Sequence, residues 1–156
     1  MLESYHRNGY SENWINQRLK SIEVRKELTD EWERRGIKRG QEFATLTDII
    51  TQGWSGMTTR QYKRYKGLKT ESLRDNMTNL ELVLNMLAEA TTTEISKERR
   101  PRTFAANRIV AAQGGRIAGN TRREIEAQTG KKIVSRLNAE QVLAAKEIEQ
   151  NEEEKE

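Results

Sequence analysis

The stretch Thr78–Ser96, "TNLELVLNMLAEATTTEIS", is the most apolar part of a chain in which hydrophobic residues make up only 34% of the total. Its apolar residues surround most of a helix axis, so we predict that this segment is the central, most buried helix of the fold. Thr78 followed by Glu81 has the spacing of a capping box, which predicts that the helix begins at Asn79. The three threonines at 91–93 are β-branched and polar, and we expect them to interrupt or bend the last turns.

Sequences on both sides of this segment also favour helices. Their runs consist mainly of Ala, Leu, Glu, Lys, Arg and Gln, which are good helix formers, and the chain contains one proline. N-cap and glycine signals predict further helices at 11–35, 41–52, 58–66 and from 103, one that ends near 129, and one that begins after Asn138. We expect the glycines of "GWSG" (53–56) and of "GG" (114–115) to end two of them. The prediction is an all-α protein.

The composition limits the organisation of the chain and its class. A length of 156 residues suits one helical domain, which we place at residues 11–139, followed by an acidic helical or disordered tail at 140–156. The absence of cysteine excludes disulfides and thiolate metal sites and suits a reducing cytoplasm. The chain has no apolar run of membrane-spanning length and no signal peptide, so we predict a soluble cytoplasmic protein with no membrane partner.

Charge is distributed unevenly along the chain. The first 139 residues carry 26 basic and 17 acidic side chains, whereas the residues from Glu140 onward carry seven acidic side chains and two lysines. A basic body with an acidic tail is found in nucleic-acid binders, in which the tail can compete for the basic surface. The same pattern also fits a solvated helical protein with a frayed C-terminus.

No set of residues in the sequence indicates a reaction. His6 is the only histidine, so one chain cannot assemble a catalytic dyad or a histidine metal cluster. Carboxylate pairs such as Glu124 and Glu126 point to different faces of a helix. The glycine-rich segment 114–120 either contacts a phosphate or is a plain turn between helices. We therefore predict no catalytic residue, no metal site and no cofactor, and hence a protein that is not an enzyme.

Two basic clusters are candidates for contact with nucleic acid, with tyrosines available to stack on unpaired bases. The alternative is that their side chains only cover apolar neighbours. The second cluster consists of Lys97, Arg99, Arg100, Arg102 and Arg108 and is supported by Arg116, Arg122, Arg123, Lys131, Lys132 and Arg136. The candidate residues are Arg60, Lys63, Arg64, Lys66 and Lys69 in the first cluster and Arg99, Arg100, Arg102, Arg122 and Arg123 in the second.

Apolar positions on the first helix are candidates for a protein interface. This helix is long and its apolar stripe drifts around the axis, which suggests packing against different neighbours or against a second copy of the chain. The tryptophan of "GWSG" is either a buried anchor or an exposed aromatic. The candidate interface residues are Trp14, Ile15, Leu19, Ile22 and Trp54, and we predict a homo-oligomer.

Five segments together resemble the C-terminal region of bacterial prophage antirepressor-like proteins of the Bro-N family. They are "GYSENWINQRL" (9–19), "RKELTDEW" (25–32), "WSGMTTRQYKRYKGLK" (54–69), "LRDNMTNLELVLNMLAEATTTEIS" (73–96) and "GGRIAGNTRREIEAQTG" (114–130). DNA-damage-inducible protein D is a more distant resemblance, through "KGL" (66–68), "DNM" (75–77) and the double glycine before a basic helix.

The resemblance implies a regulatory role rather than a catalytic one. In such proteins an N-terminal Bro domain, regarded as the DNA-binding part, precedes this region, and residues 1–10 look like a remnant of the linker after it. We therefore expect a regulatory module of transcription control or of the DNA-damage response. It would act through contacts with itself or with a repressor or recombination protein. The alternative is direct binding of single-stranded nucleic acid or recombination filaments by the basic clusters.

Overall fold

The computed structural model describes residues 9–139 and 141, and all regular secondary structure in this part of the chain is helical. The predicted all-α fold is confirmed. None of its helices is both long and apolar enough to cross a membrane. Nearly all of the predicted linker remnant and acidic tail lies outside the described residues. The elements are α2 (Glu12–Arg34), α3 (Gln41–Ser55), α4 (Thr59–Tyr65), the 3-10 turn η1 (Arg74–Asn76), α5 (Asn79–Arg99) and α6 (Phe104–Thr129).

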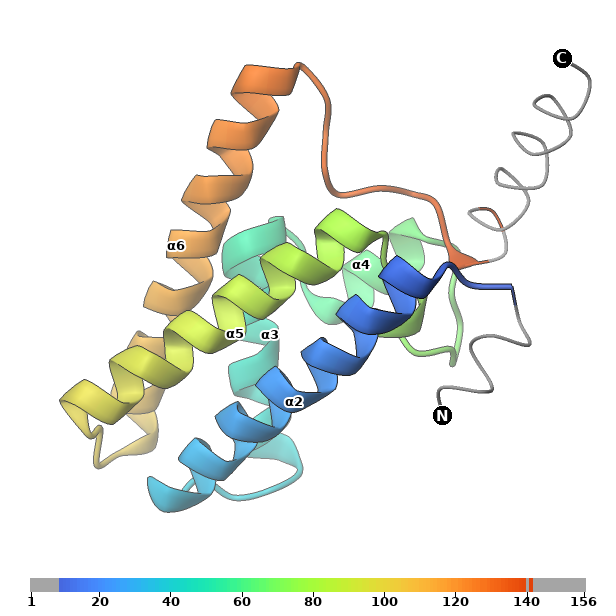
Figure 1. Cartoon of the computed structure of the whole chain (residues 1–156). Helices are drawn as coiled ribbons and strands as arrows, with labels where there is room; N and C mark the ends of the chain where they lie inside the picture. The colour runs from blue at the N-terminus through green and yellow to red at the C-terminus, as the bar shows by residue number, and fades with distance from the viewer. Residues whose placement is uncertain (1–8, 140, 142–156) are drawn as a thin grey trace, which may run out of the picture.

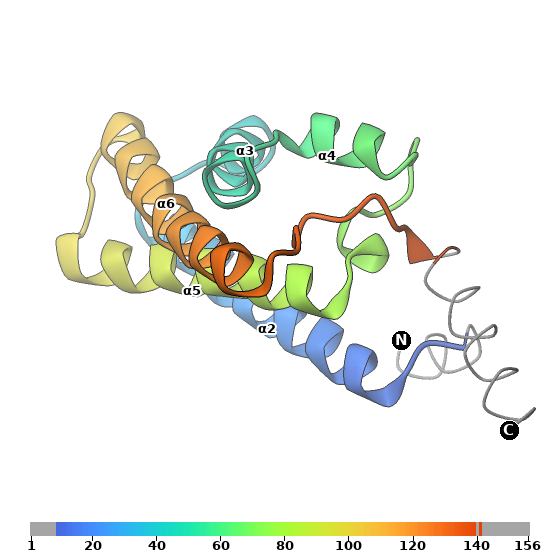
Figure 2. The same cartoon turned by 90° about the horizontal axis from the view of Figure 1, so that it is seen from above.

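Helix α5 is the centre of the fold, as its apolar sequence predicts. It packs against α2, α3 and α6, while α6 also packs along α3 (Figures 1 and 2). Thr78 accepts a hydrogen bond from the Glu81 backbone N–H and the Glu81 side chain accepts one from the Thr78 N–H, so the predicted capping box is present. Side chains such as Leu82, Leu84 and Ala88 are buried.

The threonines at 91–93 do not interrupt α5, and that prediction was wrong. The Thr92 and Thr93 hydroxyls donate to the backbone oxygens of Ala88 (2.8 Å) and Glu89 (3.0 Å), four residues earlier. These bonds satisfy the hydroxyls without competing for the N–H groups of the helix, so α5 continues to Arg99.

Helix α6 is one continuous helix of 26 residues, and the break predicted at Gly114 and Gly115 is wrong. Gly115 and Gly119 lie against the backbone of α3. A Cβ atom added at Gly115 would lie 2.8 Å from the Ile50 carbonyl oxygen, and one at Gly119 would lie 2.4 Å from the Gly53 oxygen. The glycines are therefore required by a close helix–helix contact rather than by a turn, and the segment is not a phosphate-binding loop.

Helix α3 likewise continues through the segment predicted as a tight turn. It ends at Ser55, and Gly56 adopts the left-handed conformation (φ 83°) that caps it. Gly53 faces α6, where an added Cβ would lie 2.9 Å from the Gly115 Cα. Trp54 is fully buried and donates from Nε1 to Asn85 Oδ1 at 3.1 Å. Trp54 is a buried anchor and not part of an exposed protein interface.

The interface predicted on the first helix is contradicted at Trp14 and Ile15. Trp14 and Ile15 are buried in the core of this chain, and Trp14 Nε1 donates to the Met77 carbonyl oxygen at 2.9 Å. Leu19, which packs against the core, and Ile22 are half-buried. Helix α2 packs against α5, and Trp14 also contacts the loop before α5.

A second buried carboxylate on α5 joins three segments. The Glu89 carboxylate accepts hydrogen bonds from both terminal amino groups of Arg74 (2.7 and 2.9 Å) and from one terminal amino group of Arg25 (2.9 Å). Burial alone would raise the pKa of Glu89, but these two arginines outweigh it and hold the pKa below its usual value. The ionised carboxylate therefore links α2 and η1 to α5.

We expect Gly115→Ala to destabilise the protein. In an exposed helix this change stabilises by about 1 kcal/mol, but here the added Cβ meets the α3 backbone and forces the two helices apart. The cost of such overpacking is about 1–3 kcal/mol, so the free energy of unfolding should fall. Urea denaturation measures it.

The matched control is Gln128→Ala, at an exposed position of the same helix, which should leave the unfolding midpoint unchanged. A midpoint for Gly115→Ala at or above that of the wild type would contradict the close α3–α6 contact.

Candidate nucleic-acid interface

Four of the five residues of the first basic cluster surround one hollow beside α4. Arg60, Arg64 and Lys69 are exposed and Lys63 is half-buried. With Asp48, Thr59 and Leu68 they line a cavity of about 460 Å³. The structure therefore brings these four side chains together, as the sequence predicted.

Lys66 is the exception and does not belong to this surface. Its side chain is fully buried, and its Nζ contacts Glu81 Oε1 at 2.8 Å and the Leu137 carbonyl oxygen at 2.6 Å. Burial lowers the pKa of Lys66, an effect that the Glu81 carboxylate opposes. Lys66 cannot reach a phosphate outside the protein, so its predicted role in binding nucleic acid is wrong.

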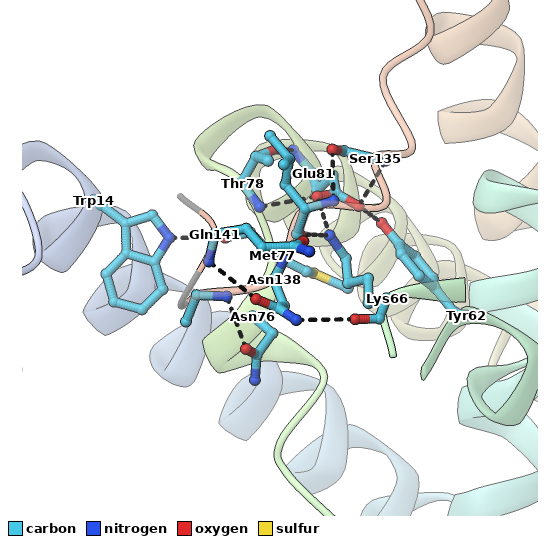
Figure 3. Close-up of polar contacts among 12 residues, drawn as sticks. Trp14, Tyr62, Lys66, Asn76, Met77, Thr78, Glu81, Ser135, Asn138 and Gln141 are labelled. Carbon is cyan, nitrogen blue, oxygen red and sulfur yellow. Dashed lines mark hydrogen bonds and ion pairs between the residues drawn. The ribbon is translucent and has the colours of Figure 1, made fainter. Parts of the chain in front are cut away.

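Glu81 holds three parts of the chain together, as Figure 3 shows. Its carboxylate accepts hydrogen bonds from the Tyr62 hydroxyl, from Lys66 and from the backbone N–H groups of Thr78 and Ser135. Burial and the Glu81 carboxylate both raise the pKa of Tyr62, so its hydroxyl remains a donor. The network ties α4 and the segment 130–139 to the start of α5.

Polar contacts fix the end of the described chain beside the same network (Figure 3). Asn138 donates from Nδ2 to the Lys66 carbonyl oxygen at 3.1 Å, and the Ala139 N–H donates to Asn76 Oδ1 at 2.9 Å. Asn138 also accepts from the Gln141 N–H at 3.1 Å, as expected of the predicted N-cap. The helix predicted after Asn138 lies almost entirely outside the described residues.

The second basic cluster is divided by the structure. Arg99, Arg100 and Arg102 are exposed where α5 ends and the link to α6 begins. Glu81, which binds Lys66 of the first cluster, lies near the start of α5, 19 positions before Arg100. At 1.5 Å per residue, this separation is about 28 Å along the helix axis. Arg99, Arg100 and Arg102 therefore lie at the opposite end of α5 from the first cluster, and the two clusters form no single patch.

The Arg122 side chain, like that of Lys66, makes polar contacts within the fold. Its Nε donates to the Trp54 carbonyl oxygen at 2.7 Å, and its NH1 contacts Glu126 at 2.6 Å. The guanidinium thus satisfies a carbonyl in the last turn of α3, where a positive charge is favoured. Arg122 is therefore structural, whereas its neighbour Arg123 is exposed and donates to Asn120.

Helix α6 carries a basic face that the sequence prediction assigned only in part. Arg108, Arg116 and Arg123 are all exposed and fall within about 80° of one another around the helix axis. They span 15 positions, or about 22 Å. No aspartate or glutamate occurs between residues 99 and 123, so no acidic side chain on α6 neutralises this face before Glu124. That absence was the sequence signal available for Arg108 and Arg116.

The described part of the chain contains no candidate metal site. Nowhere in residues 9–139 and 141 do three His, Cys, Asp or Glu side chains come together as metal ligands would. The buried carboxylates Glu81 and Glu89 are instead paired with basic side chains.

Comparisons with known proteins add no family assignment. No protein-family model matches the chain, and the curated proteins contain no significant match to it.

Replacement of Lys66 and of Lys63 should have opposite consequences. We expect Lys66→Ala to lower the free energy of unfolding by about 3–5 kcal/mol, because it leaves the buried Glu81 carboxylate without its ion pair. Lys63→Ala, three residues earlier on the edge of the hollow, should leave the free energy of unfolding unchanged. Urea denaturation of both variants measures the difference. Equal stabilities would contradict the buried position of Lys66.

Proposed function

We propose that this chain is a non-catalytic module that binds the phosphate backbone of nucleic acid through the exposed basic face of α6. Arg108, Arg116 and Arg123 form this face, and it carries the proposal because no acidic residue lies on α6 before Glu124. An unneutralised row of guanidinium groups attracts a polyanion and releases its counterions.

The dimensions of the face suit a nucleic-acid backbone. Its length of about 22 Å corresponds to about six base pairs of duplex at 3.4 Å each. The buried face of α6 packs on α3 and α5, so the arginines stand on a rigid support. The three arginines lie about 10–12 Å apart along the helix axis, which is about three base-pair steps, so they suit contact with separate backbone phosphates. Phosphate contacts of this kind carry no sequence information.

Binding should therefore depend strongly on salt and weakly on sequence. We expect the variant with Arg108→Ala, Arg116→Ala and Arg123→Ala to bind labelled duplex DNA more weakly by about tenfold or more. It should also lower the slope of log K against log salt by about 2–3, because three phosphate contacts are lost. Fluorescence anisotropy between 50 and 200 mM salt measures both.

The control variant removes the same number of charges elsewhere. Lys20, Lys26 and Lys38 are exposed on α2 and in the loop after it, and their replacement by alanine should change the slope little. If both triple variants bind alike, or if the wild type does not bind DNA, the proposed function is wrong.

A second candidate function is self-association through α5. Leu80, Val83 and Leu87 follow the spacing i, i+3, i+7 and are 41%, 36% and 37% exposed. An apolar stripe of this kind on an otherwise charged surface favours a protein contact. The occupant we propose is a second copy of the chain. The homo-oligomer predicted from the sequence cannot form through Trp14 and Ile15, which lie inside the core, whereas the stripe on α5 is exposed.

Self-association predicts a particle mass above the 18.1 kDa of one chain in light scattering. The change Val83→Glu should return it to the monomer, because it places a charge in the middle of the apolar stripe. Gln128→Glu, on α6, should not. A wild type that is monomeric at all accessible concentrations would exclude this candidate.

The resemblance to Bro-N family antirepressor-like proteins supports a regulatory setting for either activity. In that setting the module would act in the cytoplasm, in transcription control or in the DNA-damage response. A repressor or a recombination protein would then be the partner for the apolar stripe if the second copy is not.

A further inference from the structure

Four arginines that are distant in sequence surround one hollow at the end of the molecule opposite α4. Arg34 and Arg35 close α2, and Arg100 and Arg102 belong to the link between α5 and α6; with Gly36 and Pro101 they line about 420 Å³. The two helix ends meet at the lower left of Figure 1. No carboxylate lines this hollow.

A buried carboxylate orients two of the four guanidinium groups. Glu31 is fully buried and accepts from Arg34 Nε at 3.2 Å, from Arg35 Nε at 2.8 Å and from the Ser96 hydroxyl at 2.6 Å. Because both arginines contact Glu31 through Nε, their terminal amino groups remain available for a second acceptor. Glu31 thus cancels one of the four positive charges and holds two arginines in place.

Arg100 has a backbone conformation that is unusual for a residue with a side chain. Arg100 adopts φ 50° and ψ 60°, the left-handed region, and no other non-glycine residue of the described chain has a positive φ. Glycine normally occupies such a helix C-cap, as Gly56 and Gly130 do in α3 and α6. Arg100 also precedes Pro101, a position at which helical conformations are disfavoured. Backbone strain of this kind is concentrated at functional sites.

The negative C-terminal ends of α2 and α5 and the Glu31 carboxylate offset only part of the positive charge of the four arginines. The C-termini of α2 and α5 each carry about half a negative charge, so together with Glu31 they balance about two of the four arginines. A net charge of about +2 remains in the hollow, which matches the charge of about −1.5 to −2 on a phosphate monoester. An internal phosphodiester carries a single negative charge and suits the spaced arginines of α6 better.

We propose that the hollow formed by Arg34, Arg35, Arg100 and Arg102 binds the terminal phosphate monoester of a nucleic-acid strand. This inference rests on the proposed function, because the hollow lies where α6 begins and the strand would continue along Arg108, Arg116 and Arg123. The chain would then prefer phosphorylated strand ends to ends that carry a hydroxyl group.

The test compares single-stranded oligonucleotides of one sequence that carry a 5′-phosphate, a 3′-phosphate or hydroxyl groups at both ends, each labelled away from the end tested. In fluorescence anisotropy we expect one of the two phosphorylated strands to bind at least about fivefold more tightly than the hydroxyl strand. Arg100→Gly should abolish this ratio, although it relieves the strained backbone and should leave the melting temperature unchanged or higher. Arg102→Ala, which needs no backbone change, should abolish it as well.

The control is Lys97→Ala, at an exposed position on the last turns of α5 outside the hollow, which should keep the preference. If all three strands bind equally to the wild type, the terminal-phosphate site is wrong while the proposed function stands. If no strand binds while duplex DNA does, this inference is wrong and the proposed function stands; if duplex DNA does not bind either, both are wrong. A preference that survives both Arg100→Gly and Arg102→Ala would place the terminal phosphate elsewhere.

Discussion

The fold depends on the close contact between α3 and α6. Gly53, Gly115 and Gly119 let the two backbones approach to a distance at which a single methyl group would collide with a carbonyl oxygen. Once α6 lies this close, one of its faces is fully used by α3 and α5, and the other can only face solvent. The same constraint that stabilises the core therefore presents Arg108, Arg116 and Arg123 at the surface.

Charged side chains in this protein serve two distinct purposes. Inside, Glu31, Glu81 and Glu89 are buried on α2 and α5 and each binds at least one basic residue. Since a buried charge without a partner is costly, these pairs favour one arrangement of helices over others. Outside, some arginines and lysines also pair with acidic side chains, whereas the stretch between residues 99 and 123 contains no aspartate or glutamate. The high charge content of the chain thus supports both its folding and its proposed binding.

The three exposed basic regions have different geometries, and this difference organises the proposed function. The α4 hollow lies near the start of α5, where Glu81 binds Lys66, and the arginine hollow lies where α5 ends and α6 begins. Figure 1 shows how α5 runs between these two regions. A row of separated arginines suits the evenly spaced charges of a backbone, whereas four convergent arginines suit one concentrated charge. A strand that begins in the arginine hollow and follows α6 would use both kinds of contact.

The sequence by itself determined the helical class, the start of α5 at its capping box, the central place of that helix and the basic character of the surface. These features depend on local hydrogen bonds and on composition, which neighbouring residues express directly. Only the tertiary structure decided the rest. It showed that Gly114 and Gly115 lie within a helix, that Lys66 is inside the core and that Arg34 and Arg35 join Arg100 and Arg102. A glycine that ends a helix and one that admits a neighbouring backbone are identical in sequence, and so are an exposed lysine and one paired with a buried carboxylate. What separates them is a partner distant along the chain.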